Sequence, residues 1–128
     1  MMATPAPFLQ VILQRHPMDC AVACLAMYLG KSYEEVLMAF RHNVMAQGAS
    51  MRQIQMAARK LGSPLRWSRK VDIETDCGIL SVASTIWKSD HVVVIKNEMV
   101  IDTDATVWEA SDFFSIYSAR PMSLLTLR

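Results

Sequence analysis

Cys20 opens an apolar run, Cys20 to Leu29, whose composition predicts a helix. A thiol at a helix N-terminus lies beside unpaired backbone N–H groups and the positive end of the helix dipole, and both favour the reactive thiolate. Cys24 follows one helical turn later, inside the run, where we expect it to be buried and inert. Cys20 is therefore the candidate nucleophile, and the competing interpretation is a small core residue.

A thiol nucleophile needs a base, and His91 is the best placed histidine. It follows a polar turn and opens an apolar strand-like run, so its imidazole could exchange a proton with a thiol at a helix terminus. His16 is too close to Cys20 in sequence for that geometry, although it could line a cleft. His42 follows a helix end, where the dipole favours a cation in a structural role.

An acid is needed to orient the imidazole and fix its tautomer. Asp102 ends the next apolar run, and a turn at residues 97 and 98 would pair that run with the strand that begins at His91. Extending this pairing places His91 opposite about residue 104, so Asp104 competes for the role. We favour Asp102, because its position at a strand end is better defined than a turn position.

Gln14 stands six residues before Cys20 and is the candidate donor to an oxyanion. Its side-chain amide and the backbone N–H of Cys20 could together stabilise a developing negative charge. Such donors contribute roughly 3–4 kcal/mol each in comparable sites.

The elements that must position these residues fall into two groups. Helices come first: Asp19 is expected to cap the helix that Gly30 ends, Ser32 to cap a helix that runs to about Phe40, and Ser50 to cap a helix that Gly62 ends, with a loop at 43–48 between the last two. We expect strands at 64–67, 78–83, 91–96, 99–102, 106–108 and 122–127, and a short helix at 110–117 capped by Ser111. The order predicts one α+β domain over residues 1–128, with N-terminal helices packed on a C-terminal antiparallel sheet. Trp67, Trp87 and Trp108 could form an interface or fill the core, and we favour the core.

Composition excludes several classes of protein. The 13 basic and 12 acidic side chains leave a net charge of +1, which gives no electrostatic case for nucleic acid or an anionic membrane. No apolar window is long enough for a transmembrane helix, and the N-terminus lacks a signal-peptide pattern, so we expect no membrane insertion. Three cysteines argue against a disulfide framework and favour a reducing, cytoplasmic setting. Cys20 and Cys24 are spaced C-x3-C without a second ligand pair, so we expect no metal and no other cofactor.

Four segments resemble those of one enzyme family. Residues 14–27 are similar to the nucleophile motif of family thirty-nine of the cysteine peptidases, the bacteriocin-processing double-glycine leader peptidases of the papain-like clan. Residues 48–58 resemble the family's next helix start, 91–94 its histidine strand and 100–102 its acid strand. The resemblance implies a papain-like fold, here as a stand-alone domain of bacterial or phage type.

Position by position, the resemblance implies Cys20 as nucleophile, His91 as general acid and base, Asp102 as orienting acid and Gln14 as oxyanion donor. The sequence departs from the family at Ala21, where glycine is usual, and at Thr103, where proline is usual. We expect Ala21 to narrow the cleft beside the thiol.

The resulting hypothesis is a cysteine peptidase that cleaves an extended peptide or protein substrate after small residues. The same thiol and imidazole would also serve another amide substrate. The alternative is a peptide-binding module of the same fold without turnover. The sequence carries no indication of oligomeric state.

Overall fold

The structure is a computed structural model that describes residues 11–13, 15, 18–41, 43–87 and 90–127. The helices are α1 (Cys20–Leu29), α2 (Tyr33–Ala39), α3 (Val44–Gln47), α4 (Met51–Lys60) and α5 (Ala110–Ile116). The strands are β1 (Leu65–Ser68), β2 (Gly78–Ser84), β3 (His91–Lys96), β4 (Met99–Ile101), β5 (Val107–Glu109) and β6 (Ala119–Leu127). Within these ranges no helix is long and apolar enough to cross a membrane.

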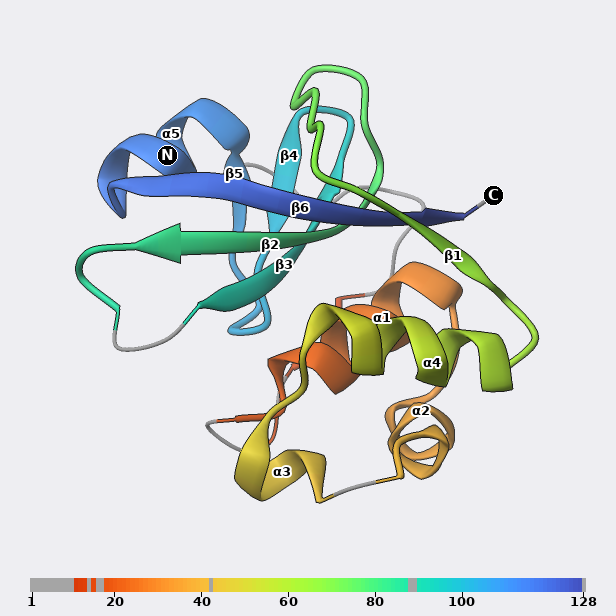
Figure 1. Cartoon of the computed structure of the whole chain (residues 1–128). Helices are drawn as coiled ribbons and strands as arrows, with labels where there is room; N and C mark the ends of the chain where they lie inside the picture. The colour runs from red at the N-terminus through yellow and green to blue at the C-terminus, as the bar shows by residue number, and fades with distance from the viewer. Residues whose placement is uncertain (1–10, 14, 16–17, 42, 88–89, 128) are drawn as a thin grey trace.

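The strands form one antiparallel sheet in the order β1-β6-β2-β3-β4-β5. Figure 1 shows α1 to α4 together on one side of this sheet, while α5 lies at the other side near β5 and β6. The predicted α+β arrangement of helices packed on an antiparallel sheet is thereby confirmed. The predicted hairpin register is also confirmed, because Lys96 pairs with Met99.

Both faces of the sheet are covered, and alternate strand residues enter two cores. On the helical side, Ile79, Val92, Val94, Ile101 and Leu125 pack with the buried residues of α1, α2 and α4. On the other side, Leu80, Val82, Val93, Ile95, Val100 and Leu124 pack with Ala110 and Phe113 of α5. Burial on both faces explains why β2 and β3 are apolar almost throughout.

Two of the predicted helix caps are present. The Ser32 hydroxyl accepts a hydrogen bond from the backbone N–H of Glu35, and Ser50 and Gln53 form a reciprocal capping box at α4. Gly30 ends α1 with φ of 68°, a left-handed conformation that glycine adopts without a steric penalty.

The predicted cap of α1 is confirmed in position only. Asp19 is the N-cap residue of α1, but its side chain makes no capping hydrogen bond to the described first turn. Its carboxylate instead accepts hydrogen bonds from the Arg15 backbone N–H at 3.0 Å and from the Tyr33 hydroxyl. Because these two donors come from outside α1, the buried carboxylate turns away from the helix it was expected to cap.

The remaining differences concern element boundaries. Residues 44–47 form the single-turn helix α3 inside the expected loop, anchored by the buried side chain of Val44. Helix α5 starts at Ala110, so Ser111 lies within it and does not cap it. Strand β6 starts three residues early because Ala119 and Arg120 extend its pairing to Ser84 and Ala83, past an irregularity at Ser81 and Val82.

Candidate active site

Cys20 and His91 meet where the first turn of α1 packs against the start of β3. The link is made one turn into the helix, where the Cys24 thiol donates a hydrogen bond to the Val92 carbonyl at 3.3 Å. This contact fixes the helix against the strand residue next to His91. One helical turn earlier, the Cys20 side chain lies close enough to His91 to raise the pKa of the imidazole. The buried Cys24 therefore helps to set the register between the two elements.

The other side of the imidazole faces Asp102. His91 Nε2 lies 2.7 Å from Asp102 Oδ1, and the two side chains are only 24% and 11% exposed. Asp102 Oδ1 also accepts the backbone N–H of Thr103 at 2.7 Å. A proline at position 103 could not donate this bond, so the departure from the usual proline gives the carboxylate an additional donor.

Asp104 does not compete for His91 in this structure. Its carboxylate accepts hydrogen bonds from the backbone N–H and the hydroxyl of Thr106 within its own turn. The β3–β4 pairing ends at Val94 and Ile101, and the Asp102 N–H then bonds the Thr106 carbonyl at 2.9 Å. The chain turns at Asp102. Residue 104, which the extended pairing placed opposite His91, therefore lies past the point where β3 and β4 diverge.

The surroundings of His91 favour its charged form. Burial lowers the pKa of the imidazole, but the hydrogen bonds and charges of Asp102 and Cys20 oppose it and raise the pKa to about 10. With Nε2 engaged by Asp102, Nδ1 is the ring nitrogen left for the thiol. An imidazolium held between a carboxylate and a thiol is the arrangement that supports a thiolate nucleophile.

Trp87 was expected to fill the core, and it also borders the site. Its ring lies edge-on to the His91 ring, with centroids 5.6 Å apart. It also contacts Phe113 and Tyr117 on the side of the sheet that α5 covers. It therefore restricts the imidazole from the side away from α1. An aromatic residue four positions before the candidate histidine was the available signal.

The candidate residues open onto a cleft of about 940 Å³. One part of its lining comes from residues 47–53, between α3 and the first turn of α4, with Trp67 of β1 beside them. Another part comes from the segment around Trp87 and from Tyr117. Cys20, His91 and Asp102 all contribute to the surface of the cleft.

Ala21 does not narrow this cleft. It is buried in the helical core and is not among the described residues that line the cleft, so the expectation is wrong. Trp67 likewise departs from the expected core role, since it is 47% exposed at the cleft. Trp87 and Trp108 pack, as expected, against the core between the sheet and α5.

The other histidines, Gln14 and the other two cysteines are not among the described residues that line the cleft. Gln14, His16 and His42 lie outside the described residues. Burial raises the pKa of the Cys24 thiol well above its ordinary value, and burial also raises that of Cys77. Among the described residues, no group of three or more histidine, cysteine, aspartate or glutamate side chains could hold a metal ion.

A family model for the peptidase C39 family matches residues 9–100, most of the chain, and spans the elements from α1 to β3 and the start of β4. The chain belongs to the peptidase C39 family. A sequence search of curated proteins gives no significant match.

Two solved structures resemble this C39 chain over nearly its whole length. One is a double-glycine-motif protease from an AMS/PCAT transporter, in complex with its leader peptide; the TM-score is 0.68 at 19% identity, and the match covers 93% of this chain and 90% of that one. The other is the peptidase domain of Streptococcus ComA, a bifunctional ABC transporter of a quorum-sensing pathway; the TM-score is 0.67 at 21% identity, with 95% and 98% covered. At these identities the likeness shows the fold, a papain-like C39 peptidase fold.

Proposed function

We propose that this chain is an active cysteine peptidase that uses Cys20, His91 and Asp102. The observation that carries the proposal is the His91 imidazole, held charged between the Cys20 thiol and the Asp102 carboxylate. The peptidase C39 family match supports the same chemistry. Three free cysteines in the described part of the chain agree with a reducing, cytoplasmic setting, where a thiol nucleophile stays active.

In the proposed reaction the Cys20 thiolate attacks the scissile carbonyl carbon and forms a tetrahedral intermediate. His91 then gives its proton to the leaving amine, and the C–N bond breaks to leave a thioester on Cys20. Neutral His91 next takes a proton from water, which attacks the thioester and releases the carboxylic acid product. Asp102 stabilises the imidazolium and holds its orientation in both steps.

The oxyanion would be held at the N-terminus of α1. We assign this role to the Cys20 backbone N–H and to the Gln14 side-chain amide, as the sequence spacing suggests. The positive end of the α1 dipole adds to their effect.

The substrate class follows from the cleft. An open, partly apolar groove with the thiol in its wall suits an extended peptide. One of the two similar solved structures is a protease in complex with a leader peptide, which supports a peptide substrate for this chain too. We propose cleavage after small residues, because small side chains let the peptide backbone approach a nucleophile that lies in the wall of the cleft.

Digestion of a mixed peptide library by the parent chain and by Cys20→Ala tests the proposal. We expect cleavage by the parent chain, none by the variant, and small residues before the cut. Alkylation by iodoacetamide at neutral pH should modify Cys20 before Cys24 and Cys77, because burial raises the pKa of both other thiols. Peptide binding without cleavage, together with equal labelling of all three thiols, would instead establish a non-catalytic binding module.

A further inference from the structure

The basic side chains are concentrated in one segment of the chain. Residues 51–71 contain six of the 13 basic side chains and none of the 12 acidic ones. The six are Arg52, Arg59, Lys60, Arg66, Arg69 and Lys70, and all are exposed. The rest of the chain therefore has seven basic side chains against twelve acidic ones, and the small net charge conceals a strong local asymmetry.

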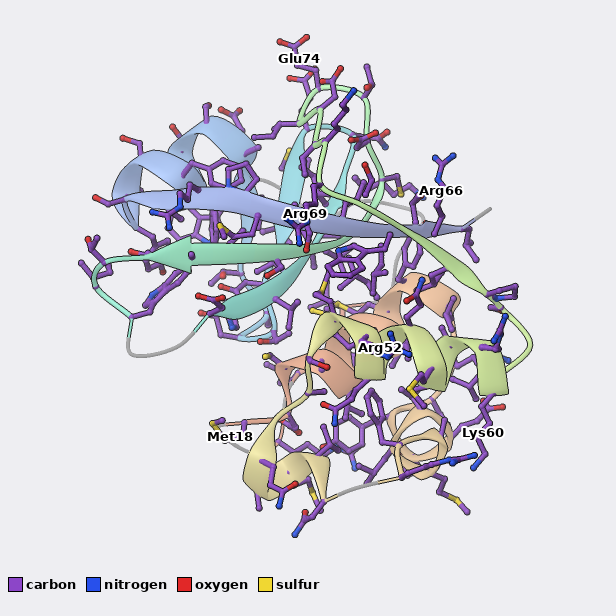
Figure 2. The ribbon with its side chains drawn as sticks, in the orientation of Figure 1. Met18, Arg52, Lys60, Arg66, Arg69 and Glu74 are labelled. Carbon is purple, nitrogen blue, oxygen red and sulfur yellow. The ribbon has the colours of Figure 1, made fainter. Side chains whose placement is uncertain are left out.

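One of these cations lines the candidate active-site cleft, and a second lies near Trp67, which also lines it. Arg52, in the first turn of α4, lines the cleft together with Trp67 of β1. The guanidinium carbon of Arg69 lies 5.9 Å from the centre of the Trp67 ring. Figure 2 shows Arg52 and Arg69 on the side of the molecule that faces the viewer. Trp67 lines the cleft together with Arg52, so its contact with Arg69 brings a second guanidinium close to the cleft.

Neither arginine is neutralised by the part of the chain that the structure describes. The ion pairs among those residues involve Arg15, Lys31 and His91, and not Arg52 or Arg69. Helix α4 also directs its positive N-terminal end toward the cleft, since residues 50–53 line it. An anionic group placed there would meet two planar guanidinium groups that can each bind a carboxylate through paired hydrogen bonds.

We propose that Arg52, Trp67 and Arg69 form a subsite that selects peptides with a glutamate or aspartate on the flank of the scissile bond that crosses α4 and β1. This inference rests on the proposed peptidase function, because it assumes that a peptide occupies the cleft. Trp67 supplies an apolar platform for the side-chain stem, and the arginines hold the carboxylate. At the other part of the cleft, the exposed Asp90 disfavours a second acidic residue near His91.

A peptide is favoured over nucleic acid because Arg52 and Trp67 share one cleft with Cys20, and Arg69 lies over the Trp67 ring. A chain bound at the thiol reaches Arg52 and Trp67 without leaving the cleft. The cations at the far end of α4, Arg59 and Lys60, do not line it and lie about 10–12 Å along the helix from Arg52. This exceeds the screening length of roughly 8 Å at physiological salt, so they contribute little at the subsite.

The test measures binding in the Cys20→Ala background, which separates recognition from turnover. The probes are fluorescein-labelled peptides of about twelve residues, roughly 40 Å when extended, with a central Gly-Gly and a single glutamate or glutamine placed in turn at each other position. At one or more positions on one side of the Gly-Gly, we expect the glutamate peptide to bind about fivefold more tightly than the glutamine peptide. This corresponds to a difference in binding free energy of roughly 1 kcal/mol.

The variant R52Q/R69Q should remove that preference, and the matched variant R59Q/K60Q, with the same loss of charge, should retain it. Equal affinity for glutamate and glutamine peptides at every position would overturn the inference. So would an equal loss of preference in R59Q/K60Q, or tighter binding of single-stranded oligothymidine that depends on Arg52 and Arg69. If the parent chain cleaves no peptide while the Cys20→Ala chain still binds glutamate peptides selectively, the proposed peptidase function is rejected and the subsite stands.

Discussion

At the scale of single residues, the site depends on which acid faces His91. Asp102 bonds the imidazole, whereas Asp104 bonds Thr106 within its own turn. These two carboxylates lie two residues apart in sequence and have different partners. They offer a matched pair of substitutions with nearly identical chemistry.

Asp102→Asn should lower kcat/KM for peptide cleavage by roughly 10²–10⁴-fold, because an amide cannot stabilise the imidazolium or fix its tautomer as a carboxylate does. Asp104→Asn should change it by less than about threefold, since its partners lie outside the site. Steady-state rates on one fluorogenic peptide measure both. Equal losses in the two variants would reject the assignment of Asp102.

The protonation of His91 gives a second prediction. Its pKa is raised from 6.5 to about 10 in the folded chain by Asp102 and Cys20, against the effect of burial. A group with a raised pKa stabilises the fold fully below its unfolded value. Its contribution is then lost as pH rises through the folded value. The contribution of His91 should therefore decline between pH 6.5 and about pH 10.

Urea unfolding of the parent chain and of His91→Gln across this range checks the prediction. The difference in unfolding free energy between them should be largest at the acidic end and should shrink toward pH 10. A difference that stays constant with pH would show that His91 is not held as an imidazolium.

At the scale of elements, the junction before α1 places Cys20, the proposed nucleophile. The Asp19 carboxylate is 0% exposed and accepts the Tyr33 hydroxyl of α2, while Arg15 lies over the Tyr33 ring at 4.0 Å. Arg15 also pairs with Glu34 at 3.1 Å. These contacts join the segment before Cys20 to the start of α2, so the position of the thiol depends on a second helix.

Tyr33→Phe should destabilise the fold by about 1–3 kcal/mol, because it removes a donor from a buried carboxylate. It should also slow alkylation of Cys20, the next residue after Asp19. Ser32→Ala is the control: it removes the cap of α2, at a cost of about 1 kcal/mol, without touching Asp19. If both variants slow labelling equally, the effect is loss of stability alone and the positioning role is wrong.

At the scale of the whole molecule, the sheet aligns the two halves of the site. Strand β6 is last in sequence but lies between β1 and β2. It therefore connects β1, which carries Trp67, to the β2–β3 pair that carries His91. Gly78 sits at the start of β2, where a Cβ atom would lie 2.3 Å from the backbone carbonyl oxygen of Leu125 in β6.

Gly78→Ala should therefore force β2 and β6 apart and destabilise the fold by about 1–3 kcal/mol. Thermal unfolding measures this as a fall in Tm of several degrees. Ser84→Ala, at the other end of β2, is the comparison; it loses the hydrogen bond to the Tyr117 carbonyl but forces no backbone apart. An unchanged Tm for Gly78→Ala would mean that the β2–β6 spacing is not tight.

Much of this protein follows from local sequence alone. Pattern and turn chemistry predict the helix over Cys20–Leu29, the Ser50 cap of α4 and the hairpin turn at Asn97 and Glu98, because each depends on near neighbours. The order of Cys20, His91 and Asp102 along the chain was likewise sufficient to suggest thiol chemistry.

Tertiary structure decided the contacts between distant segments. The side chain of Asp19 bonds Tyr33 rather than the helix it precedes, and the chain turns at Asp102, so Asp102 and not Asp104 meets His91. Trp67 is exposed at the cleft, although its residue type favours a core. Local patterns cannot predict these outcomes, because each depends on which partner from a remote segment packs within hydrogen-bonding or van der Waals distance.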